Sequence, residues 1–243
     1  MSLMLPPARL LEAGELGARL HPIDRAIMVL RLADPREQDP ATLSIAERDR
    51  RLARLQRDMF GDAMPCVVHC PRCNAEQEFD LSATLLLDTL GDPPSAEIIN
   101  HDGWDITLRA LDSHDLAAAA QERGLHDASE ILIRRAVVTA TGASGPVDFD
   151  ALPVDVQNAV SERVGEREAA GDIALDLTCV ACAENWTTGF DIAPYLWVEI
   201  DAAGRRLLVE IAALAGRFGW SEAELLQMSA ARRRAYLATE ERP

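Results

Sequence analysis

Two short segments of the sequence, His69-Cys-Pro-Arg-Cys-Asn74 and Thr178-Cys-Val-Ala-Cys-Ala183, decide how the fold is interpreted. Each contains a Cys-x-x-Cys pair, a knuckle that presents two thiolates from one tight turn of backbone. Because Zn²⁺ favours four soft ligands in a tetrahedron, two knuckles complete one coordination shell. We therefore predict one structural zinc ion with four ligands, Cys70, Cys73, Cys179 and Cys182.

The two knuckles have similar surroundings. Each is preceded by an apolar segment and followed by an aromatic-acidic-aliphatic triplet, Phe79-Asp-Leu81 in the first case and Phe190-Asp-Ile192 in the second. This weak internal repeat predicts two strand-knuckle-strand halves of one zinc ribbon, residues 66–81 and 173–192. Each half supplies only two ligands, so the halves must meet in space. Because folding and site formation are coupled, we expect metal removal to loosen the protein as a whole.

Other uses of the four cysteines remain open. Two redox-active motifs are one alternative, although no thioredoxin-like βαβ pattern surrounds either pair. Loss of the metal ion, leaving unligated thiols, is another. A knuckle usually has glycine after its second cysteine, at a position of positive φ that Asn74 tolerates and Ala183 tolerates poorly. A catalytic zinc ion is disfavoured, since four cysteines leave no open position for water.

The remaining candidate residues do not suggest a catalytic centre. Cys66 is interpreted as a small buried apolar residue rather than a fifth ligand. His69 adjoins a ligand and is interpreted as an exposed residue or an outer partner of the site. Asp112-Ser-His-Asp115 has the residue types of a catalytic triad, but sequence neighbours rarely form one, and the segment is typical of a helix cap. We therefore predict that the protein is not an enzyme.

The rest of the chain predicts an α+β fold that is mainly helical. Residues 1–65 form an N-terminal helical region, and residues 193–243 form C-terminal helices. Residues 82–172 form an acidic α/β insertion between the ribbon halves. Within the insertion, apolar segments on either side of Asp102-Gly103 predict a small β-hairpin.

Local signals place several helices. Ser44 and Glu47 have the spacing of a capping box at the start of one helix. Residues 113–140 are interpreted as helix, interrupted near Gly124. A long helix with one apolar stripe begins after Asp191, which can cap it, and ends at Gly219.

Charge and composition exclude several functions. The chain of 243 residues has a net charge of −16, and residues 66–190 contribute 22 acidic residues against seven arginines. Such a segment repels phosphate backbones, so we predict no binding of nucleic acid. No apolar run approaches the roughly 20 residues of a membrane span. The N-terminus lacks the basic start, apolar run and cleavage site of a signal peptide.

The C-terminal part of the sequence resembles a known family. The resemblance covers residues 173–240, in particular the knuckle segment 173–186, the segment Phe218-Gly-Trp-Ser-Glu-Ala-Glu-Leu-Leu226 and the segment Arg232-Arg-Arg-Ala-Tyr-Leu237. It is looser over 66–81. The sequence is similar to the T-even-type baseplate hub proteins and baseplate hub assembly chaperones of contractile phage tails and related injection systems.

This resemblance implies a non-enzymatic role as a structural or assembly protein of a baseplate. It implies that the partners are other baseplate or tail hub proteins, and that the protein lies in the bacterial cytoplasm during assembly or in the particle. Trp197, Trp220 and Tyr236 are the residue types that anchor interfaces, although a core role suits them equally. A zinc-ribbon adaptor for nucleic acid or the transcription machinery is the alternative, and the acidic middle of the chain argues against it.

Overall fold

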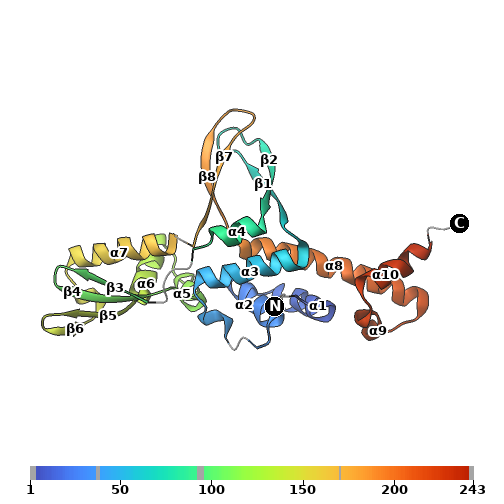
Figure 1. Ribbon diagram of the computed structural model, residues 1–243, viewed down its shortest axis with the longest axis horizontal. Coiled ribbons are helices and arrows are strands. Elements are labelled where there is room, and N and C mark those ends of the chain that lie inside the picture. Colours follow the sequence, from blue (N-terminus) through green and yellow to red (C-terminus); the bar gives the residue numbers. More distant parts are fainter. Residues whose placement is uncertain (1–3, 37–38, 92–95, 170, 241–243) are drawn as a thin grey trace.

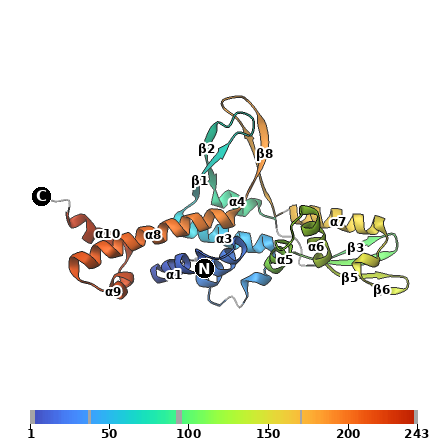
Figure 2. The same ribbon diagram turned by 180° about the vertical axis from the view of Figure 1, so that it is seen from behind.

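The computed structural model describes residues 4–36, 39–91, 96–169 and 171–240. It shows an elongated molecule with a helical body at its centre, a sheet-containing part at one end and the C-terminal helices at the other (Figure 1). Two hairpins project side by side from the helical body, as both views show (Figures 1 and 2). The fold is α+β and mainly helical, as the sequence predicts.

The helical body packs around the first half of the longest helix. Its helices are α1 (Pro7–Gly17), α2 (Pro22–Ala33), α3 (Ile45–Phe60), α4 (Ala83–Thr89) and α8 (Ile192–Phe218), with a 3₁₀ turn at Pro40–Thr42. Leu52 and Leu55 of α3 pack with Leu196 and Ile200 of α8, and all four side chains are buried. Burying such side chains contributes about 1.5–3 kcal/mol each.

The long helix begins and ends as the sequence predicts. The Asp191 carboxylate accepts a hydrogen bond from the N–H of Ala193 at the N-terminus, and Gly219 closes the C-terminus at φ +68°. The second half of α8 packs its apolar stripe on α9 (Glu222–Gln227) and α10 (Ala230–Leu237), which precedes a 3₁₀ turn at Ala238–Glu240. Although α8 has 27 residues, no helix in the described ranges has both the length and the apolarity that a membrane span requires.

The cap of α3 differs in part from the prediction. Ser44 accepts a hydrogen bond from the N–H of Glu47, as expected of an N-cap residue. The Glu47 carboxylate instead pairs with Arg50 at 3.0 Å and Arg51 at 2.8 Å. Two arginines on the following turn therefore compete with the backbone for this side chain.

The inserted part contains a four-stranded antiparallel sheet in the order β3-β4-β5-β6. Its elements are β3 (Ala96–His101), β4 (Trp104–Arg109), α5 (Ser113–Ala119), α6 (Leu125–Ala136), β5 (Val137–Gly142), β6 (Gly145–Val147), a 3₁₀ turn at Phe149–Ala151 and α7 (Val154–Ala169). The hairpin at Asp102-Gly103 is confirmed, with His101 opposite Trp104. Ile106 and Leu108 of β4 pack with Val156 and Val160 of α7 to form a second core.

The predicted helix over residues 113–140 is wrong at its end. Helix α6 ends at Ala136, and Val137–Gly142 forms strand β5. In that strand Ala140 lies opposite Ile106 of β4. The sequence Val-Val-Thr at 137–139 favours a strand, because β-branched side chains pack well on a pleated surface, and pairing with β4 decides the outcome.

The projecting hairpins are two separate two-stranded sheets. Strands β1 (Ala63–His69) and β2 (Glu76–Ser82) form the first, and β7 (Ile173–Thr178) and β8 (Asn185–Phe190) form the second. The first hairpin therefore begins at Ala63, inside the range assigned to the N-terminal helices. Each hairpin has its knuckle at the tip and leads from its base into a helix, α4 or α8 (Figure 1).

Candidate metal centre

The two knuckles have the same backbone hydrogen bonds. In each, the first cysteine closes the turn through both its N–H and its carbonyl group. The bonds are Cys70 N–H to Ala75 O (3.0 Å), Asn74 N–H to Cys70 O (2.9 Å), Cys179 N–H to Glu184 O (2.8 Å) and Ala183 N–H to Cys179 O (2.9 Å). Identical turns thus present both cysteine pairs, although the sequences inside them differ.

The residue after each second cysteine lies in the left-handed region. Asn74 and Ala183 both have a φ of 58°, as the knuckle pattern predicts. Asparagine adopts this conformation readily, whereas alanine brings its Cβ close to the backbone there. The second knuckle therefore contains a strained residue where glycine would relieve the strain.

We expect Ala183→Gly to stabilise the second knuckle. Removing the left-handed strain contributes about 1 kcal/mol, offset in part by the greater freedom of glycine in the unfolded chain. Ala181→Gly in the same knuckle is the matched control, because φ of Ala181 is not positive. Chelator titrations of metal release should show tighter retention in Ala183→Gly alone; equal retention in both variants would contradict the strain argument.

The four predicted ligands lie together between the hairpin tips. Their Sγ atoms are all within 4.8 Å of one another. Two contacts cross from one hairpin to the other, Cys70 Sγ to Cys182 Sγ at 3.7 Å and Cys73 Sγ to Cys179 Sγ at 3.6 Å. Cys70 and Cys179 are each 2% exposed. The four cysteines therefore form a group that is able to hold a metal ion.

The pKa values of the thiols depend on how close the thiols lie to one another and to backbone N–H groups. Burial disfavours ionisation of the Cys179 thiol, but hydrogen bonds from the backbone N–H groups of Ala181 and Cys182 favour it and lower the pKa of Cys179 to about 6. The Glu184 N–H favours ionisation of Cys182, but burial and the neighbouring thiols raise the pKa of Cys182 to about 12. The Cys179 thiolate thus forms easily, and a thiolate in the group disfavours ionisation of the neighbouring thiols. A bound cation removes this repulsion, which couples metal binding to proton release.

Two contacts between the hairpins were not predicted. The Gln77 amide of β2 reaches the second knuckle, where its nitrogen lies 3.1 Å from Cys179 Sγ. With the amide turned over, the nitrogen donates to Thr178 O (3.3 Å) and the oxygen accepts from Val180 N–H (3.2 Å). Arg72 Nη1 lies 3.0 Å from Glu184 Oε2 across the knuckles. Neither residue has a sequence signal beyond its proximity to a cysteine, because these contacts depend on how the hairpins meet.

The other candidate residues lie outside the cysteine group. Cys66 is half-buried, its Sγ donates to Met64 O at 3.4 Å, and burial raises the pKa of its thiol. His69 is exposed, with Nε2 3.7 Å from Glu76. Asp112 and Asp115 form the capping box of α5, which confirms the interpretation of that segment as a helix cap.

Comparison with known proteins gives no further assignment: no family model, no curated protein and no solved structure matches the chain. Fold and site together define an α+β protein in which two distant Cys-x-x-Cys knuckles form one group able to bind a metal ion.

Proposed function

We propose that the four cysteines hold one structural zinc ion that clasps the two hairpins. In a tetrahedral site with Zn–S bonds of about 2.3 Å, neighbouring sulfur atoms lie about 3.8 Å apart. The separations of 3.6 and 3.7 Å between the hairpins are close to this value. A disulfide needs about 2.05 Å, so the thiols have the spacing of ligands. Four cysteine ligands leave no position for substrate, and the zinc ion supplies cross-linking alone.

Metal analysis of the purified protein tests the identity of the ion. Tetrahedral thiolate sites favour zinc or iron, which differ in visible absorbance. We expect one zinc ion per chain and a colourless protein, with all four cysteines resistant to alkylation until a chelator is added. Iron in place of zinc would overturn the metal assignment, and free reactivity of the four thiols would overturn ligation itself.

We further propose that the protein is a structural or assembly component of the baseplate of a phage tail-like contractile particle. The single observation that carries this proposal is the resemblance over residues 173–240. These residues comprise the second hairpin and helices α8, α9 and α10, which extend to one end of the molecule (Figure 1). An elongated shape and a long accessible helix suit a protein that connects others.

Helix α8 offers apolar surface to a partner. Val198 is 63% exposed and Val209 is 70% exposed, and they lie about three turns apart on the same face. Of the two roles that the sequence leaves open for the aromatic residues, their contacts within the chain favour internal packing. Trp220 and Tyr236 form an aromatic cluster with Phe218, while Trp197 packs on the helical body. We therefore assign the partner surface to the exposed aliphatic face of α8.

Deleting the coding sequence in the host should prevent the assembly of functional baseplates. Electron microscopy of particles from deletion and complemented strains measures this directly, and mass spectrometry of wild-type particles separates the two roles. Several copies per particle would identify a permanent subunit, and absence from the particle with an assembly defect would identify a chaperone. Normal particles from the deletion strain would contradict both roles.

A further inference from the structure

A cavity of about 570 Å³ lies where the helical body meets the inserted part. Its walls come from α3, from α5 to α7 and from the joint between β8 and α8. Backbone contacts fix the two sides: Ile45 N–H donates to Leu111 O at 3.0 Å, and Ser44 pairs with Asp112 as an isolated bridge. The cavity is of the size that proteins use to bind ligands or side chains.

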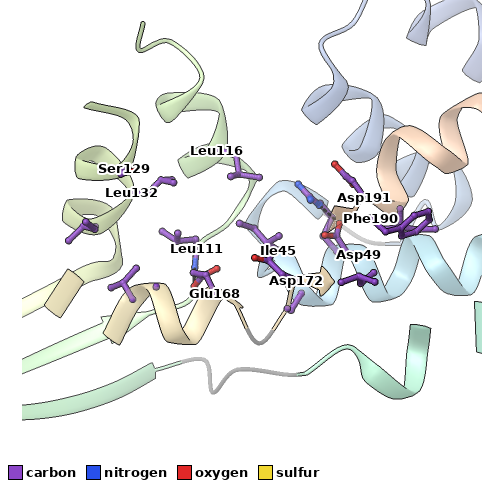
Figure 3. Close-up of a pocket in the computed structure, with 18 of the residues that line it drawn as sticks. Ile45, Asp49, Leu111, Leu116, Ser129, Leu132, Glu168, Asp172, Phe190 and Asp191 are labelled. Atoms are coloured by element: carbon purple, nitrogen blue, oxygen red, sulfur yellow. Dashed lines mark hydrogen bonds and ion pairs between the residues drawn. The ribbon is translucent and has the colours of Figure 1, made fainter. Parts of the chain in front are cut away.

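The walls of this cavity are mainly apolar. Figure 3 shows Leu116 and Leu132 on one side, Phe190 on the opposite side, and Leu111 and Ile45 between them. These side chains form a floor that suits aliphatic groups. Leu111 is 3% exposed, so the floor is continuous with the core of the inserted part.

Acidic side chains surround the apolar floor. Asp49, Glu168, Asp172 and Asp191 line the cavity, and Arg48 is the one basic residue among its described lining residues. Arg48 is already paired, with Nε 2.7 Å from the Asp49 carboxylate. The cavity therefore has an excess of three negative charges that no lining side chain offsets.

The half-buried carboxylates of Asp49 and Glu168 show the effect of this excess. Burial raises the pKa of Asp49, and the nearby Asp191 and Asp172 raise it further against the influence of Arg48. Burial also raises the pKa of Glu168, although the Leu111 N–H donates to its carboxylate at 3.4 Å. Positive charge brought into the cavity would lower the cost of keeping these groups ionised.

We propose that this cavity docks a short segment of a partner protein in which an arginine or lysine is flanked by apolar side chains. The apolar floor takes the flanking side chains, and the carboxylates of Glu168, Asp172 and Asp191 receive the cation. A small free cation would pair with the carboxylates but would leave the apolar floor uncovered. The inference deepens the assembly role proposed above and rests on it for the existence of a partner, but it does not involve the cysteine group.

Fluorescence anisotropy with short labelled peptides tests the docking on metal-loaded, full-length protein. The probe is a peptide of leucine, alanine and arginine, and its control replaces each arginine by the neutral isostere citrulline. We expect saturable binding of the arginine peptide, and about fivefold weaker binding to Asp172→Asn, as loss of one partly exposed charge implies. Free spermidine should compete poorly.

We expect Gly165→Leu to block the cavity while the fold is retained. Gly165 lies on α7 in the cavity wall, and a Cβ added there meets no atom within 4 Å. Leucine is also the better helix former, and an unchanged thermal unfolding midpoint of this variant separates blocking of the cavity from unfolding. Gly14→Leu is the matched control, because Gly14 lies on α1, a Cβ added there also meets no atom within 4 Å, and it is outside the cavity.

Arginine-dependent binding that Gly165→Leu abolishes and Gly14→Leu preserves supports the docking site. Equal binding of the citrulline peptide, full competition by spermidine, or unchanged binding to Gly165→Leu would each overturn it. Absence of saturable binding at millimolar peptide would overturn it as well. None of these results affects the deletion phenotype, so the proposed baseplate role stands or falls separately.

Discussion

Replacing Cys179 by serine is expected to release both hairpins while the helical body stays folded. The hairpins share no strand pairing, and an isolated two-stranded hairpin is marginally stable in water. Loss of one ligand should therefore raise amide hydrogen exchange in residues 63–82 and 173–190 by at least about 100-fold, equivalent to about 3 kcal/mol. Metal removal by a chelator should have the same effect.

Cys70→Ser should match Cys179→Ser, because each removes one of four equivalent ligands from the same group. Cys66→Ser is the control: its sulfur lies outside the group and its loss should leave metal content unchanged. Widely different effects of Cys70→Ser and Cys179→Ser would exclude a shared site. Loss of protection in α2 and α3 as well would restore the expectation that the metal ion holds the whole protein together.

The expectation that metal removal loosens the whole protein changes because of where the knuckles lie in the structure. From the sequence, a metal ion that joins two distant segments is expected to stabilise all the residues between them. In the structure the clasp is at the hairpin tips, whereas the bases are anchored independently: Met64 is fully buried in the helical body, and Ile173 and Phe190 pack on its core. We therefore expect the helical body to stay folded when the cysteines are changed or the metal ion is removed.

The knuckles were predictable because their signal is local. Cysteine spacing fixes the turn, and the positive φ at Asn74 and Ala183 follows from it. The similarity of the two aromatic triplets, in contrast, does not reflect equivalent positions. Phe79 lies inside β2 opposite Cys66, whereas Phe190 ends β8, so the two aromatic triplets are not equivalent.

The equivalent positions at the ends of the hairpins are helix caps. Ser82 accepts a hydrogen bond from Leu85 N–H at the start of α4, and Asp191 accepts one from Ala193 N–H at the start of α8. Serine and aspartate are both good N-cap residues, but they are different residue types. A search for identical residues in the two halves therefore does not detect that these positions are equivalent. The cavity beside α3 was not predictable either, because its walls come from segments that only tertiary packing brings together.

Replacing Asp115 by asparagine is expected to destabilise the inserted part by about 3 kcal/mol. The Asp115 side chain is fully buried, and Arg109 donates to it twice, at 2.7 and 2.8 Å. Arg135 Nε donates at 2.5 Å and the Asp112 N–H at 2.9 Å. Removing one partner of a buried ion pair costs about 3–5 kcal/mol, and the partial exposure of both arginines favours the lower value. Hydrogen exchange of residues 96–169 in urea measures the loss, with the exposed Glu122→Gln as the control.

The pH dependence of this loss identifies its cause. Although burial opposes ionisation, hydrogen bonds from Arg109, the Asp112 N–H and Arg135 lower the pKa of Asp115 from 3.8 to about 2. Since the folded-state pKa is the lower one, the stabilisation is complete above about pH 4 and disappears as the pH falls through about 2. The difference in unfolding free energy between wild type and Asp115→Asn should therefore be constant at neutral pH and shrink over this acid range. A difference that stays constant down to pH 2 would show that the carboxylate acts through packing and not through its charge.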